Sequence, residues 1–138
     1  MKIMEDSVFT KIIRGELPSY KLYEDAKTIV IIPLHPVAKA HVLAIPKLQV
    51  SSFYELPDEE YQALMATVKK TAAHIKNIIP AKRVGIQAVG LDVPHAHIHV
   101  IAFDTIQEFH EEPDESAPAD TKKQEELFNI LKMEPSNV

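Results

Sequence analysis

Hydrophobic residues follow two different periods along the chain, and together they predict a mixed fold of helices and strands. Apolar side chains recur every three or four positions over 57–79, which is the period of one helix face, and over shorter stretches at 7–14 and 121–133. Between them lie five runs rich in β-branched and aromatic residues, at 20–23, 28–32, 41–45, 83–89 and 95–103. The sequence therefore predicts five strands, a long central helix, a short N-terminal helix and a C-terminal helix.

The order of these elements predicts an antiparallel sheet. Short polar or turn-forming segments join 20–23 to 28–32 and 83–89 to 95–103, as in two hairpins, and the long helix lies between the hairpins. Strands and helices do not alternate, so the fold class is α+β, with helix covering one side of the sheet. A small sheet of this kind has exposed edge strands, which proteins often cover by pairing with a second subunit. A homodimer is therefore expected.

Composition limits the classes of function. The chain has 138 residues, enough for one domain, with 46% hydrophobic and 25% charged residues. Its net charge of −5 provides no positive field to attract nucleic acid, and the lack of cysteine excludes disulfides, thiol catalysis and cysteine-ligated zinc. Charged residues near Met1 leave no room for the core of a signal peptide, and the longest apolar run is too short to cross a bilayer. We therefore expect a cytoplasmic protein that binds neither nucleic acid nor membranes.

The composition changes after residue 103. Residues 104–118 are acidic and contain prolines, which predicts a solvated linker, and the predicted helix over 121–133 follows. We expect residues 1–103 to form the domain and residues 104–138 to be an extension made of that linker and the C-terminal helix, not a separate domain.

Three of the seven histidines, His95, His97 and His99, alternate along the last predicted strand. Alternate residues of a strand project from one face, so the three imidazoles share a face while Ala96 and Ile98 pack on the other. Each imidazole has two nitrogens that need partners, and protonated neighbours repel one another, so such a row is hard to explain as core packing. The spacing indicates chemistry.

The residues alone leave three kinds of chemistry open. The histidines could bind a metal, with Asp92, His35 and His41 as further ligands. They could instead perform phosphate chemistry, in which a neutral imidazole attacks phosphorus while its neighbours stabilise charge. The third hypothesis is a pH-sensing or purely binding surface.

The sequence HAHIHVI over 95–101 resembles the His-φ-His-φ-His-φ-φ signature of the histidine triad (HIT) superfamily of nucleotide hydrolases and transferases, where φ is hydrophobic. The segments 6–13, 40–47 and 90–94 are similar to the family's sequence in the same order, so the resemblance covers about residues 5–103. It points to the nucleotide phosphoramidase-like (HINT-like) branch. It implies a five-stranded antiparallel sheet with a long helix, dimerising into a ten-stranded sheet.

The resemblance also implies catalytic roles for four histidines. His97 would attack the α-phosphorus of a nucleotide and form a nucleotidyl-histidine intermediate, which water hydrolyses. His99 would bind phosphate oxygens, His41 would hold or protonate groups at the site, and His95 would orient His97. No metal and no cofactor is implied, since the structural zinc of some members needs cysteines that this chain lacks.

The implied substrate pocket has an apolar part and a polar part. Its apolar residues would enclose the nucleoside and are Val8, Phe9, Ile12, Ile31, Leu34 and Leu43. Gln87 stands where an asparagine commonly contacts phosphate. Two positions depart from the family: Pro33 replaces an acidic residue that holds the ribose hydroxyls, and Asp92 replaces a serine or threonine that donates to the phosphate or leaving group. Because a carboxylate repels phosphate, Asp92 favours an amine as the leaving group.

The sequence thus predicts a hydrolase of nucleoside phosphoramidates or related nucleotide conjugates that releases a nucleoside monophosphate. Within the family, the alternative is a dinucleoside polyphosphate hydrolase or a nucleotidyl transferase. From other classes, the alternatives are a nucleotide-binding or interaction module with weak activity and a metal-dependent hydrolase.

Overall fold

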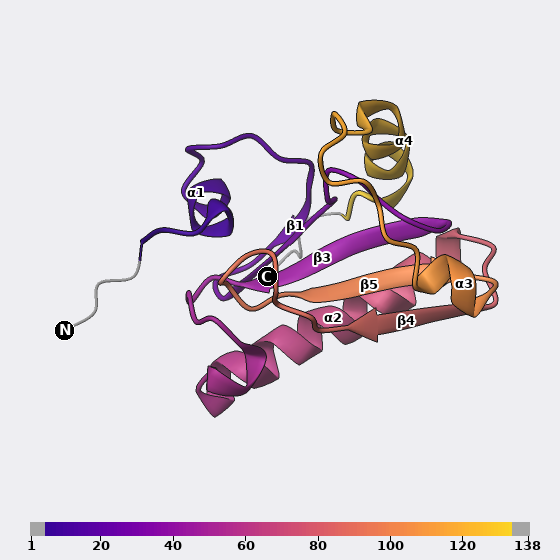
Figure 1. The fold of residues 1–138 in the computed structure, drawn as a ribbon. Coiled ribbons are helices and arrows are strands. Elements are labelled where there is room, and N and C mark those ends of the chain that lie inside the picture. The colour runs from indigo at the N-terminus through magenta and orange to yellow at the C-terminus, as the bar shows by residue number, and fades with distance from the viewer. Residues whose placement is uncertain (1–4, 134–138) are drawn as a thin grey trace.

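A computed structural model describes residues 5–133 as one antiparallel sheet covered by helices (Figure 1). The five strands lie in the order β1-β2-β3-β5-β4. They are β1 (Lys21–Glu24), β2 (Thr28–Ile31), β3 (Ala40–Pro46), β4 (Arg83–Gln87) and β5 (Ile98–Phe103). The predicted α+β class and five-stranded antiparallel sheet are confirmed. Residues 1–4 and 134–138 lie outside the described part. The first group belongs to the segment from which we predict the lack of a signal peptide, and the second is the end of the predicted extension.

The long helix α2 (Asp58–Ile78) crosses one face of the sheet. Three acidic residues occupy its first turn, where they interact favourably with the helix dipole. Its buried residues Leu64, Val68 and Ile75 recur at helical spacing, as the sequence predicts. Four shorter helical segments complete the fold: α1 (Val8–Ile13), the 3₁₀ turn η1 (Phe53–Glu55), α3 (Ile106–Phe109) and α4 (Thr121–Leu131). No helix within residues 5–133 is both long and apolar enough to cross a membrane.

Alternate residues of the central strands face two different environments. Val42 and Ala44 of β3 and Val100 of β5 belong to the main core beneath α2, which also includes Leu127 and Leu131 of α4. The residues between them on β3 and β5 face the other side of the sheet, where α1 packs (Figure 1). This alternation follows from the two-residue period of a strand. The catalytic candidates lie on the α1 side.

The last strand begins later than the sequence predicts. The predicted strand 95–103 is observed only from Ile98, and the predicted strand 83–89 ends at Gln87. The backbone of Ala96 instead donates to the carbonyl of Val50, outside the sheet. His95 and His97 therefore precede β5, and the expectation that all three imidazoles align on one strand face needs correction for His95.

The segment after β5 is largely exposed, as the predicted solvated linker would be, but it is attached to the domain. Phe109 of α3 packs against Phe103, and a Cβ atom added to Gly85 would come within 2.9 Å of the Phe109 ring, so glycine leaves the space that Phe109 occupies. From there the chain runs across the sheet to α4 (Figure 1). At its far end the carbonyl of Ala117 accepts from His35 Nε2 at 2.9 Å. We call residues 110–118, held at both ends in this way, the strap.

Candidate active site

A pocket of about 1200 Å³ lies on the α1 side of the sheet, between α1, the loop after β2 and the strap. It is large enough for a nucleotide. All of the sequence-predicted site residues except His95 line it; these are His41, His97, His99, Val8, Phe9, Ile12, Ile31, Leu34, Leu43, Gln87 and Asp92. The structure thus brings together residues from the first helix, four strands and the loop before β5.

One end of the pocket is apolar. Phe9 packs with Ile31 and Leu43, and all three side chains are at most 6% exposed. Ile12 packs against this group, whereas Val8 and Leu34 are exposed at the pocket rim. The Phe9 ring meets the His97 ring edge to face, with the ring centres 5.0 Å apart. The apolar wall therefore ends directly beside the middle histidine.

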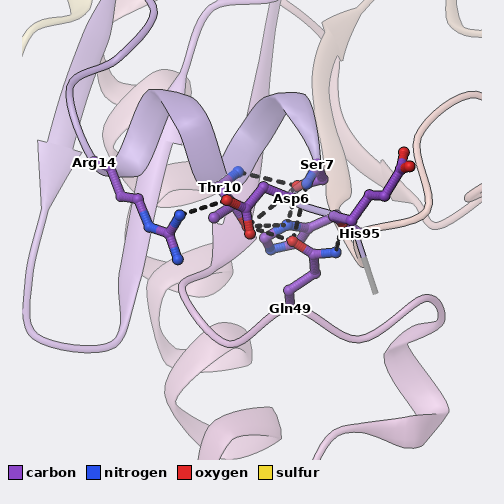
Figure 2. A network of polar contacts seen from close by, with 7 residues as sticks. Asp6, Ser7, Thr10, Arg14, Gln49 and His95 are labelled. Atoms are coloured by element: carbon purple, nitrogen blue, oxygen red, sulfur yellow. Dashed lines mark hydrogen bonds and ion pairs between the residues drawn. The ribbon is translucent and has the colours of Figure 1, made fainter. Parts of the chain in front are cut away.

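His95 is fully buried beneath the pocket and joins α1 to the rest of the molecule (Figure 2). Its Nε2 lies 2.7 Å from the carbonyl oxygen of Pro46, and because a carbonyl can only accept, Nε2 carries the proton. Nδ1 of the neutral ring is then an acceptor, and the hydroxyl of Ser7 donates to it at 2.7 Å. Ser7 Oγ also accepts from the backbone nitrogen of Thr10 and so caps α1.

Gln49 holds the same network from the other side. Its side-chain oxygen accepts from Ser7 N at 3.0 Å and from Thr10 Oγ1 at 2.6 Å (Figure 2). Its side-chain nitrogen donates to the carbonyl of Glu5. These bonds fix the start of α1 against the chain around His95. The position of Phe9, in the first turn of the same helix, follows from them.

The hydrogen bonds of His97 leave one of its nitrogens free to react. Nδ1 of His97 lies 2.7 Å from the carbonyl oxygen of His95, so Nδ1 carries the proton and donates. In the neutral ring Nε2 then holds an unshared electron pair, and no side chain or backbone group of residues 5–133 donates to it. His97 also lines the pocket, so this electron pair belongs to a side chain that a bound molecule can reach.

His41 and His99 form a second chain of hydrogen bonds. The backbone nitrogen of Val37 donates to His41 Nδ1 at 3.1 Å, so the proton of neutral His41 is on Nε2. That nitrogen donates to Nδ1 of His99 at 2.9 Å, which leaves the proton of neutral His99 on its Nε2. The rings of His97 and His99 are 5.2 Å apart. The pocket therefore offers a lone pair on His97 beside an N–H donor on His99.

Burial keeps these imidazoles neutral. It lowers the pKa of His41 to about 3, with further lowering by the charges of His99 and Lys123. It lowers the pKa of His99 to about 4, helped by His97 and opposed by the carboxylate of Asp92. Burial also lowers the pKa values of His95 and His97. Neutral rings fit the tautomers assigned above, and a neutral His97 keeps its electron pair.

These pKa shifts predict that the protein loses stability as the pH falls below 6.5. Unfolded histidines bind protons near pH 6.5, whereas folded His41 stays neutral to about pH 3 and His99 to about pH 4. The unfolded state then binds more protons, and each such histidine lowers the free energy of unfolding by about 1.4 kcal/mol per pH unit. Urea unfolding at pH 7.5, 6.5 and 5.5 measures this.

The variant His41→Asn is the control for that measurement, because it removes the most strongly shifted group. Its free energy of unfolding is expected to change less steeply with pH than that of the wild type. The raised pKa of His35, whose main cause is the bond to the Ala117 carbonyl, acts in the opposite direction and partly offsets the loss. A free energy of unfolding that does not change between pH 7.5 and 5.5 would contradict the prediction.

The structure also adds residues that the sequence analysis did not select. Strap residues His110, Glu111, Glu112 and Glu115 line the pocket, as does Gln124 of α4. The resemblance ends at residue 103, and a polar, acidic segment has no periodicity that says where it lies. The predicted helix over 121–133, observed at 121–131, was one signal that this region docks.

The structure gives no support to the metal hypothesis. Within residues 5–133 no three or more histidine, aspartate or glutamate side chains are placed so that they could hold one metal ion. His41 and His99 bond to each other instead of pointing at a common centre. Asp92 and His35, the other ligands considered, lie at the pocket lining, where His35 bonds to the strap.

Comparison with known proteins agrees with this geometry. A family model described as HIT domain matches residues 14–106. This chain belongs to the HIT family. The similarity in fold extends beyond residues 14–106. A HIT-like protein of Bartonella henselae superposes on 96% of this chain and 98% of its own with a TM-score of 0.80, at 24% sequence identity. The resemblance stated from the sequence is confirmed.

Two curated HIT relatives carry the same name. Adenosine 5′-monophosphoramidase HNT1 of Candida albicans is 42% identical over 69 residues, which are 50% of this chain and 45% of that protein. This chain therefore matches less than half the length of that relative. Adenosine 5′-monophosphoramidase hnt1 of Schizosaccharomyces pombe is 34% identical over 98 residues, which are 68% of this chain and 71% of that protein. Both names agree with the predicted phosphoramidase-like branch.

Proposed function

We propose that this HIT protein is a nucleotide hydrolase that cleaves nucleoside phosphoramidates and related conjugates and releases a nucleoside monophosphate. The observation that carries the proposal is the pair of tautomers in the pocket: an unshared pair on His97 Nε2 beside an N–H donor on His99. The names of the two yeast relatives support the same reaction.

The reaction takes two displacements at phosphorus. His97 Nε2 attacks the α-phosphorus, the bond from phosphorus to the leaving nitrogen breaks, and the leaving amine keeps that electron pair and takes up a proton from water. Water then attacks the phosphorus of the nucleotidyl-histidine, the phosphorus–Nε2 bond breaks with its electron pair returning to Nε2, and the nucleoside monophosphate leaves. The proton that this water loses balances the one that the amine took up. The positive charge that forms on His97 is shared with the His95 carbonyl through Nδ1–H.

The remaining pocket residues have matching tasks in this proposal. Nε2–H of His99 donates to a phosphate oxygen where negative charge grows, and His41 fixes the orientation of His99. Gln87, directly opposite His99 on β4, adds an amide toward the phosphate. The apolar wall of Phe9, Ile31 and Leu43 takes the base.

The charge at the pocket favours an amine as the leaving group over a phosphate. The carboxylate of Asp92 is close enough to raise the pKa values of His97 and His99 against the effect of burial. Exposed Glu111 and Glu112 of the strap line the same pocket. Negative charge repels a phosphate chain and attracts a protonated amine. The alternative within the family, hydrolysis of dinucleoside polyphosphates, is therefore the less favoured one.

We test the reaction and its leaving group together. Protein treated with EDTA is expected to release AMP from adenosine 5′-phosphoramidate faster than from diadenosine polyphosphate. In the Asp92→Ser variant this preference should fall about tenfold, the effect of roughly 1.4 kcal/mol of lost charge repulsion. The matched control is Asp114→Ser, a strap carboxylate outside the pocket lining. Wild-type protein that binds AMP but releases none from either substrate would favour the binding-module hypothesis, and activity that returns only with zinc would favour the metal-dependent one.

The quaternary structure and the division of the chain are part of the proposal. Within residues 5–133 nothing pairs with the outer edge of β4, and Ile86 on that strand is 46% exposed. We propose that β4 of a second copy pairs there and forms a ten-stranded sheet, which the molar mass in solution tests. We also propose a domain over residues 1–103 with residues 104–138 as its extension, and a cytoplasmic location.

A further inference from the structure

The first turn of α4 holds the loop that follows β2. The backbone nitrogen of Asp120 donates to the carbonyl of Leu34 at 2.9 Å, and Lys123 Nζ donates to the carbonyl of Ala38 at 2.8 Å. Gln124 Nε2 donates to the carbonyl of Pro33 at 3.1 Å. The start of α4 thus reaches the loop at three points, in addition to the bond between Ala117 of the strap and His35. Val37 of the same loop donates to His41, so this loop is also part of the site.

Gln124 differs from its neighbours on α4 because it also reaches the pocket. Its side chain is only 4% exposed, and it lines the pocket. Since the Pro33 carbonyl can only accept, the atom facing Pro33 is the amide nitrogen, and the oxygen Oε1 is the other atom of the group. Within residues 5–133 no group donates a hydrogen bond to Oε1. The only fully buried side-chain nitrogen or oxygen without a partner in this part of the chain is Thr71 Oγ1, so Oε1 is not fully buried. Oε1 is therefore an acceptor without a partner among these residues, and it belongs to a side chain that lines the pocket.

The position of Pro33 connects this acceptor to the substrate. Pro33 lies two residues after Ile31 of the apolar wall, so the Gln124 amide lies where that wall ends on the β2 side. A sugar is bonded to both the base and the phosphate, so it must lie between the apolar wall and the histidines. Proline offers no side-chain acceptor for its hydroxyls, whereas Gln124 Oε1 accepts and a sugar hydroxyl donates.

We infer that Gln124 of the C-terminal extension binds a ribose hydroxyl of the nucleotide, through Oε1, in place of a side chain at position 33. The inference rests on the proposal that the pocket takes a nucleotide. It assigns the extension a direct part in recognising the sugar, with the Pro33 carbonyl holding the amide in the required orientation. Of the strap carboxylates that line the pocket, Glu115 already pairs with His35 Nδ1 at 3.2 Å, and Glu111 and Glu112 are exposed.

Direct binding tests this without depending on hydrolysis. We titrate the full chain with AMP and with 2′,3′-dideoxy-AMP, which lacks both hydroxyls. The wild type is expected to bind AMP about tenfold more tightly, which corresponds to about 1.4 kcal/mol. Gln124→Met keeps the length of the side chain but has no oxygen, so its preference for AMP should fall to less than about twofold.

The matched control is Lys123→Met, which removes a bond between the same turn of α4 and the same loop but changes no pocket residue. This variant is expected to keep the wild-type preference. An unchanged preference in Gln124→Met, an equal loss in Lys123→Met, or wild type that does not distinguish the two ligands would overturn the inference. Protein that prefers AMP through Gln124 but releases no AMP from the phosphoramidate would overturn the proposed hydrolysis and leave this inference standing.

Discussion

Replacement of His97 by alanine is expected to lower the release of AMP from adenosine 5′-phosphoramidate by at least about 10⁴-fold, because it removes the proposed nucleophile. Of His41, His97 and His99, His97 is the one whose unprotonated nitrogen has no hydrogen-bond donor in the described part of the chain, since its Nδ1–H is bonded to the His95 carbonyl and Nε2 keeps the unshared pair. Without that nitrogen the variant cannot form the covalent intermediate, so the second displacement by water cannot follow. Steady-state release of AMP by the purified variant measures the effect.

His99→Ala is the matched comparison, because the two rings are neighbours in the same pocket. It removes a donor to the phosphate but not the nucleophile, so a smaller loss of about 10²- to 10³-fold is expected. Protein quenched during turnover should show a mass increase of one nucleotidyl group, located on His97 and lacking in His97→Ala. Equal losses in the two variants, or an adduct on another residue, would contradict the assignment. Urea unfolding of both variants shows that the fold is kept.

Ser7→Ala is expected to lower the free energy of unfolding by about 2 to 4 kcal/mol, a large effect for the loss of one oxygen atom. The Ser7 hydroxyl caps α1 by accepting from Thr10 N, and losing such a cap costs about 1 kcal/mol. It also donates to Nδ1 of His95, a fully buried atom whose remaining neighbour, Thr10 Oγ1, is 3.4 Å away. An unpaired buried acceptor costs about 1 to 3 kcal/mol more.

Asp120→Ala is the matched control for this second variant. Asp120 caps α4 by accepting from Lys123 N, but its exposed side chain supports no buried histidine. It should therefore cost only the cap, about 1 kcal/mol. The difference between the two variants measures the bond from Ser7 to His95. If Ser7→Ala and Asp120→Ala cost the same, His95 does not depend on Ser7. Because Ser7 also fixes α1 and hence Phe9, Ser7→Ala should raise the KM for the nucleotide as well.

Much of the fold could be predicted because it depends on local periods. The three-to-four-residue spacing around Leu64, Val68 and Ile75 places one face of α2 in the core, and the two-residue spacing around Val42 and Val100 divides the sheet into two faces. These patterns need no knowledge of distant residues. The predicted strand ends were less accurate. The backbone of Ala96 bonds to Val50 in a loop, and no local sequence pattern indicates such a distant partner.

The candidate site was predicted as a list of residues, but not as an arrangement. The alternation of His97 and His99 indicated a shared face, and the structure places both in one pocket with His41. Their tautomers depend on the carbonyl of His95 and the amide of Val37, and the tautomer of His95 depends on Pro46 and Ser7. Hydrogen bonds of this kind join residues far apart in the chain, so the sequence carries no local signal for them.

The sequence by itself determined the class of the fold, the family and the residues that could do chemistry, because strand and helix periods and the HAHIHVI motif are local properties of the chain. Only the tertiary structure decided which nitrogen of each histidine carries a proton, and that the strap and Gln124 border the same pocket. The physical reason is that protonation and burial depend on partners brought together by folding. For residues 104–133 the decisive contacts are Phe109 over Gly85 and Gln124 on Pro33.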